Sequence, residues 1–209
     1  MQSDLIRLLA NIDLTKNELA SSFFILINGF SPCRVERHQC IQIEPLKVPK
    51  MINNEIELDF EKLEAACQLA LVNQQTLAEQ VGLTSQDLEL IYQSGTSKYQ
   101  MGLPAEAIVD FTYLVMHQPW DRRFHLGLGS CLHWLGEYQH ALTFYGYALL
   151  MDACSPEASF RIAQCFLSLN DDAAAIEALQ MAISQSYSKP EHHFVGDQAQ
   201  QLLSALNNQ

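Results

Sequence analysis

Residues that could bind a metal ion or react with a substrate are few in this chain. Cys33, His38 and Cys40 are close enough in sequence to share a metal ion, but a fourth ligand is missing and their spacing matches no usual zinc site. His192 and His193 are adjacent near the C-terminus, which is more typical of a solvated pair than of a ligand set. We therefore expect no metal site.

The sequence Gly127-Leu-Gly129 suggests a nucleotide-binding loop. No strand pattern precedes it and the third glycine is not at the required spacing, so close packing between helices is the better interpretation. Carboxylates are numerous, with 24 Asp and Glu against 12 Lys and Arg, but none is paired with a plausible nucleophile or base. We expect neither enzymatic activity nor a cofactor.

A pattern of small and aromatic residues instead recurs every 34 residues in the C-terminal half of the chain. Three segments align without a gap: 88–121, 122–155 and 156–189. The aligned columns are Gly95, Gly129 and Ala163; Gly102, Gly136 and Asn170; Ala107, Ala141 and Ala175; and Phe111, Tyr145 and Leu179. This is the period of the tetratricopeptide (TPR) repeat, a helix–turn–helix unit. TPR arrays usually hold another polypeptide, so the pattern favours a binding protein.

Packed helices give these columns a physical reason. Glycine inside a helix costs about 1 kcal/mol relative to alanine, so its recurrence at Gly95 and Gly129 predicts a second helix in close contact. Gly102 and Gly136 are expected to end the first helix of a pair in the left-handed conformation. Asn170 is the next-best residue for that conformation.

The remaining sequence completes an all-α prediction. Residues 51–87 are expected to form an N-terminal helical region, 88–189 the three repeats, and 190–209 a C-terminal helix that caps the array. Thr84 and Asp87 have the spacing of a capping box before the first repeat. The N-terminal region also has an apolar stripe at helical spacing, for which we predict weak homodimerisation. Its residues are Phe60, Leu63 and Cys67.

Charge separates residues 1–50 from the rest. They carry a net charge of +1, against −13 for residues 51–209. Met51 could itself be a start codon, so residues 1–50 are either an unusual extension or an artefact of start-site choice.

We find no run of 18 apolar residues and no signal-peptide pattern. The six cysteines form no CxxC pair, which favours a reducing cytosol. The acidic body argues against nucleic acid and suits a basic or apolar polypeptide.

In a TPR unit, the second, fifth, ninth, twelfth and thirteenth positions of the first helix face the concave groove. The candidate peptide-binding residues at these positions are Tyr92, Thr96, Tyr99, Arg123, Leu126, Ser130, His133, Trp134, Phe160, Gln164 and Leu167. They predict an aromatic and apolar trough for an extended peptide. The alternative is that some of these side chains pack on the N-terminal helix. We expect the aromatic anchors, Tyr92 and Phe160 among them, to be buried only in the complex.

The second repeat is more specific than a generic TPR. The segments 121–131, 135–138, 145–148 and 151–152, together with Ala141, strongly resemble the LcrH/SycD family, the class II chaperones of bacterial type III secretion. The segments 90–92, 98–102 and 160–167 resemble the same family, and the similarity covers roughly residues 60–189.

This resemblance implies a cytoplasmic, ATP-independent chaperone that holds pore-forming translocator proteins. It implies that a short extended segment of the translocator lies in the concave groove, where Tyr92, Tyr99, Leu126 and Phe160 match groove residues of the family. Alternatives are a chaperone for a needle subunit or another secreted substrate, and a TPR scaffold or regulatory adaptor without a role in export.

Overall fold

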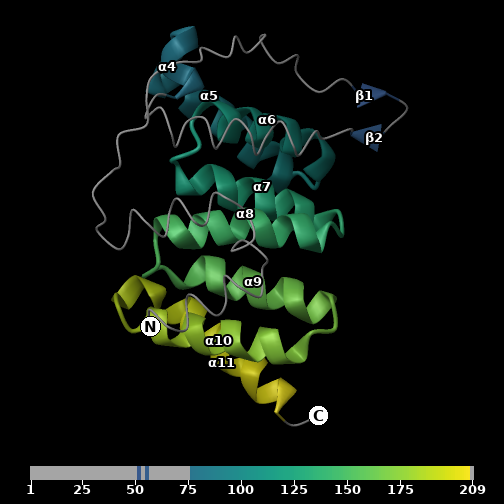
Figure 1. Ribbon diagram of the computed structural model, residues 1–209, viewed down its shortest axis with the longest axis vertical. Helices are drawn as coiled ribbons and strands as arrows, with labels where there is room; N and C mark the ends of the chain where they lie inside the picture. The colour runs from purple at the N-terminus through teal and green to yellow at the C-terminus, as the bar shows by residue number, and fades with distance from the viewer. Residues whose placement is uncertain (1–50, 53–54, 57–75, 208–209) are drawn as a thin grey trace, which may run out of the picture.

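The computed structural model of the chain describes residues 51–52, 55–56 and 76–207. In the range 76–207, helix pairs stack one after another along the long axis of the molecule, from α4 at one end to α11 at the other (Figure 1). The helices are α4 (Leu77–Val81), α5 (Ser85–Gln100), α6 (Pro104–His117), α7 (Arg122–Trp134), α8 (Tyr138–Met151), α9 (Pro156–Ser168), α10 (Asp172–Ser186) and α11 (His193–Leu206), with a 3-10 turn, η2 (Pro190–His192), before α11.

The three pairs α5–α6, α7–α8 and α9–α10 are the three predicted repeats. The prediction of an all-α protein with three tandem TPR-like units and a C-terminal helix is thus confirmed. Short strands β1 (Met51–Ile52) and β2 (Glu55–Ile56) pair antiparallel, with Met51 opposite Ile56, so these four residues are not helical. Phe60, Leu63 and Cys67 lie outside the described residues, as do Cys33, His38, Cys40 and the whole of residues 1–50.

Local signals in the sequence set the helix ends. Thr84 and Asp87 form the predicted capping box, because the Asp87 amide donates to Thr84 Oγ1 at 3.2 Å and the Thr84 amide donates to Asp87 Oδ2 at 2.9 Å. Gly102 (φ +77°), Gly136 (φ +83°) and Asn170 (φ +60°) all adopt the left-handed conformation after a first helix. There the chain turns back and the second helix begins.

The core lies between the helices of each pair and between successive pairs. The columns Ala107, Ala141, Ala175 and Phe111, Tyr145, Leu179 are buried in every repeat. At the C-terminal end α11 packs on α10, with Ala199 buried and Gly196 so close to Ser186 that a side chain on Gly196 would clash. Within the described ranges, no helix is both long enough and apolar enough to cross a membrane.

Candidate peptide-binding groove

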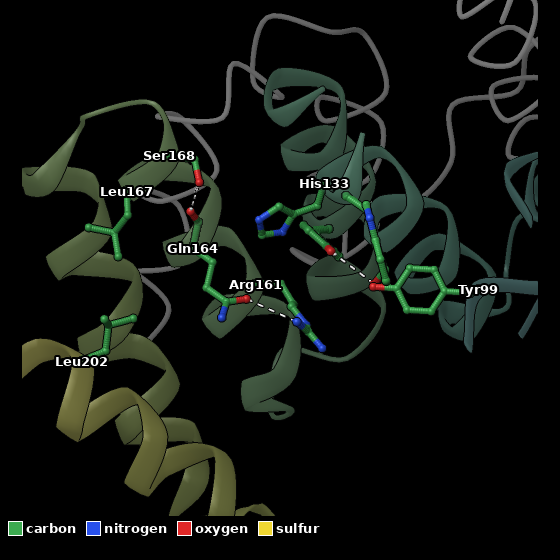
Figure 2. Close-up of a pocket in the computed structure, with 10 residues that line it drawn as sticks. Tyr99, His133, Arg161, Gln164, Leu167, Ser168 and Leu202 are labelled. Carbon is green, nitrogen blue, oxygen red and sulfur yellow. Dashed lines mark hydrogen bonds between the residues drawn. The ribbon is translucent and has the colours of Figure 1, made fainter. Parts of the chain in front are cut away.

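The first helices of the repeats bring six of the eleven predicted groove residues together. They line a pocket of about 450 Å³. The six are Tyr99 from α5, Ser130, His133 and Trp134 from α7, and Gln164 and Leu167 from α9. Figure 2 shows Arg161 and Gln164 in the middle of this pocket, with Leu167 and Leu202 on one side and His133 and Tyr99 on the other. The pocket therefore spans all three repeats.

Ser168 also lines this pocket, from the thirteenth position of its repeat, although it is not among the eleven candidates. Three further residues of the pocket were not predicted. Tyr145 comes from α8, the second helix of its pair, and Leu202 comes from α11, which was expected only to cap the array. Arg161 lies on α9, at a position that the TPR rule does not assign to the groove. The apolar pattern of the last helix was the one signal in the sequence that could have indicated Leu202.

A second pocket of about 530 Å³ adjoins the first and contains Phe160. The two pockets share Arg161 and Gln164. The wall of the second pocket opposite α9 comes from α11 and includes Phe194, whose side chain is 70% exposed. Because the shared residues join the two pockets, the groove continues on both sides of Arg161.

The other four predicted residues, Tyr92, Thr96, Arg123 and Leu126, line neither of these two pockets. The Tyr92 ring packs edge-on against Phe111, with 6.0 Å between ring centroids, and lies 5.7 Å from the Phe124 ring. Arg123 lies over the Tyr92 ring, with its guanidinium carbon 4.7 Å from the ring centroid. Tyr92 is thus half-buried in the free protein. Phe160 is half-buried too, so the expectation that these two rings become buried only in a complex is wrong.

Ion pairs hold Arg123 in this place. Its guanidinium lies 3.1 Å from Glu89 and 2.8 Å from Asp121. The α5 end of the predicted trough is therefore occupied by the protein's own aromatic and charged side chains.

Aromatic side chains form a wall of the first pocket. Trp134 is 56% exposed and stands edge-on to Tyr99, with 5.2 Å between the ring centroids. Tyr145 donates a hydrogen bond from its hydroxyl to Ser130 Oγ at 3.2 Å, and burial raises the pKa of Tyr145. An apolar side chain of a bound segment can pack on Trp134 and Tyr99, while Ser130 and Gln164 offer hydrogen bonds to its backbone.

Cysteine and histidine in this region have the properties of structural groups. Burial raises the pKa of both Cys131 and Cys165 to about 12, so both remain thiols at neutral pH and are poor nucleophiles. His133 Nδ1 lies 3.8 Å from Cys165 Sγ. Burial, and secondarily the charge of Arg161, lowers the pKa of His133. In the part of the chain that the structure describes, no group of three or more His, Cys, Asp or Glu could hold a metal ion.

Individual relatives identify the family of this chain, although no family model matches it. The low calcium response locus protein H of Yersinia pseudotuberculosis is 30% identical over 148 residues, which are 71% of this chain and 88% of that protein. The solved structure of SycD, a type III secretion translocator chaperone of Yersinia enterocolitica, is 32% identical, covers 62% of this chain and 97% of its own, and gives a TM-score of 0.60.

A third relative was solved with a ligand. PcrH of Pseudomonas aeruginosa, in complex with the chaperone-binding region of PopD, is 35% identical, covers 61% of this chain and 96% of its own, and gives a TM-score of 0.59. These similarities extend over 88% to 97% of the length of each relative. The chain belongs to the LcrH/SycD family of type III secretion translocator chaperones.

Proposed function

We propose that this protein is a cytoplasmic chaperone of type III secretion that binds hydrophobic, pore-forming translocator proteins and keeps them soluble and competent for export. The observation that carries this proposal is the groove itself, to which all three repeats and α11 contribute side chains. Its lining combines exposed aromatic and apolar groups with hydrogen-bonding side chains, which suits an extended segment with spaced apolar residues.

The arrangement of the groove supports binding without any chemical step. Burial of the client's apolar side chains against Trp134, Tyr99 and Leu167 supplies the free energy, at roughly 25 cal/mol per Å² of apolar surface removed from water. Ser130 and Gln164 satisfy backbone groups of an extended chain that would otherwise lose their hydrogen bonds to water. The solved complex of the related PcrH with the chaperone-binding region of PopD supports the binding of a translocator segment by this chain.

Self-association is a second part of this proposal. The apolar stripe of Phe60, Leu63 and Cys67 is proposed as the surface of a weak homodimer, in the region 51–87 that precedes the repeats.

Co-expression with the translocators encoded by the same genome tests the proposal. A translocator with long apolar segments is expected to stay in the soluble fraction and to co-purify with the full chain, and to aggregate without it. The needle subunit from the same genome, expressed in the same way, distinguishes the two kinds of export client. If no translocator gains solubility or forms a complex with the chain, the proposed function is wrong.

A further inference from the structure

Arg161 differs from every other Lys and Arg side chain that the structure describes. Lys98 pairs with Asp110 at 2.7 Å, Arg122 with Asp152 and Glu157, Arg123 with Glu89 and Asp121, and Lys189 with Glu191 at 3.8 Å. Within the described ranges, Arg161 alone has no carboxylate partner. This is unexpected in a chain with 24 Asp and Glu and a net charge of −12.

The surroundings of Arg161 explain how its charge is held in the groove. Its Nη1 donates to Gln164 Oε1 at 3.3 Å, which fixes the guanidinium against α9 (Figure 2). The first pocket is lined, among the described residues, by no Asp or Glu. The second pocket contains Glu157 and Glu191, and each of these carboxylates is already in an ion pair with another Lys or Arg. A guanidinium has five N–H donors, and most of those of Arg161 have no partner among the residues that the structure describes, so they can bind a ligand.

The position of Arg161 also indicates where a ligand group would sit. Arg161 and Gln164 line both pockets, so a bound chain that follows the groove passes over them and continues on either side. A group that meets Arg161 therefore belongs to the interior of the bound segment and not to its end. Apolar anchors are available on one side at Trp134 and on the other at Phe160.

We propose that the client segment places an Asp or Glu side chain on Arg161, between two apolar anchors. A carboxylate matches the planar donor geometry of a guanidinium with two parallel hydrogen bonds. Arg161 is half-buried, and hydrogen bonds to charged groups contribute more in such a place than on an open surface. The acidic body of the protein suggests a basic ligand, but this pocket selects the opposite charge. The inference rests on the proposed function and specifies which segment the groove accepts.

Selection of displayed random peptides on the full chain tests this inference. The wild type is expected to enrich peptides with Asp or Glu at a fixed spacing from an apolar residue. Arg161→Gln is expected to lose that enrichment, and Arg161→Glu to enrich Lys or Arg at the same position. Lys189→Gln is the matched control, because it removes one positive charge from an exposed side chain that lines neither pocket.

Affinities of one selected peptide then give the size of the effect. Replacing its acidic residue by the corresponding amide is expected to weaken binding about tenfold to the wild type and hardly at all to Arg161→Gln. Peptides with an amidated C-terminus are expected to bind as well as free ones, and a loss on amidation would show that the terminal carboxylate is the ligand and overturn the inference.

Two further outcomes separate this inference from the proposed function. If selected peptides lose binding to Trp134→Ala but show no acidic preference, the groove is the client site and the inference is wrong. If no selected peptide is sensitive to Trp134→Ala or Phe160→Ala, both the inference and the proposed groove are contradicted.

Discussion

Tyr145 reaches the groove because Gly129 has no side chain. A Cβ atom on Gly129 of α7 would lie 2.7 Å from Cε1 of the Tyr145 ring, which comes from α8. The ring fills that space, and its hydroxyl extends to Ser130 on the groove side. One column of the repeat thus determines both how closely two helices pack and which side chain lines the pocket.

We predict that Gly129→Ala destabilises the protein by about 1 kcal/mol. Alanine gains about 1 kcal/mol of helix propensity, but overpacking against the fully buried Tyr145 costs about 1–3 kcal/mol. Gly95→Ala is the matched control, since its nearest contacts would be at 3.2 Å and the change should be nearly neutral. Urea unfolding of both variants measures the difference, and equal stabilities would contradict this explanation of the column.

The repeat period predicted much of this packing from the sequence, but only part of the groove. Gly129, Gly136 and Asn170 were predicted correctly because helix packing and turn geometry restrict those positions to a few residue types. Arg161 and Leu202 were missed for a different reason. Whether a side chain enters the groove depends on the angles between successive pairs and on where α11 returns, and neither is encoded in the local pattern.

Tyr92→Ala is expected to reduce the free energy of unfolding by about 2 kcal/mol. The ring packs on Phe111 and Phe124 in the free protein, and removing a fully buried aromatic side chain costs about 3–5 kcal/mol. Trp134→Ala should cost less than about 1 kcal/mol, because its side chain is 56% exposed. Thermal melts of the two variants compare their losses of stability. A larger loss for Trp134→Ala than for Tyr92→Ala would be inconsistent with the packing described.

His125 should make stability depend on pH. Its Nε2 lies 2.7 Å from the Pro119 carbonyl oxygen, and burial lowers the pKa of His125 to about 4. Because an unfolded histidine has a pKa near 6.5, protons bind the unfolded state more tightly between these two values. The contribution of neutral His125 to the free energy of unfolding is fully present above about pH 6.5. It is lost progressively as the pH falls towards 4, by up to about 3 kcal/mol.

Substitution isolates this effect. His125→Gln is expected to flatten the dependence of unfolding free energy on pH between about 6.5 and 4, although it lowers stability at neutral pH. His193→Gln, which changes an exposed histidine on α11, should leave the dependence unaltered. If the wild type and His125→Gln lose stability in parallel, buried His125 is not the cause.

Leu63→Glu should abolish self-association of the full chain. A charged side chain in the apolar stripe of Phe60, Leu63 and Cys67 would have to be desolvated in an interface. Sedimentation velocity over a range of concentrations measures this, with Tyr187→Glu as a control on a side chain that is 77% exposed in the described part. A wild type that is monomeric at all concentrations would refute the proposed dimer.

The affinity of groove variants for a translocator segment tests the central claim most directly. The variant Trp134→Ala with Phe160→Ala removes one aromatic anchor from each pocket. Calorimetry with a segment of the co-purified translocator is expected to show a loss of roughly 2 kcal/mol or more, while Tyr187→Ala binds like the wild type. Thermal melts establish that the variant remains folded. If the folded double variant binds with unchanged affinity, the groove is not the client site.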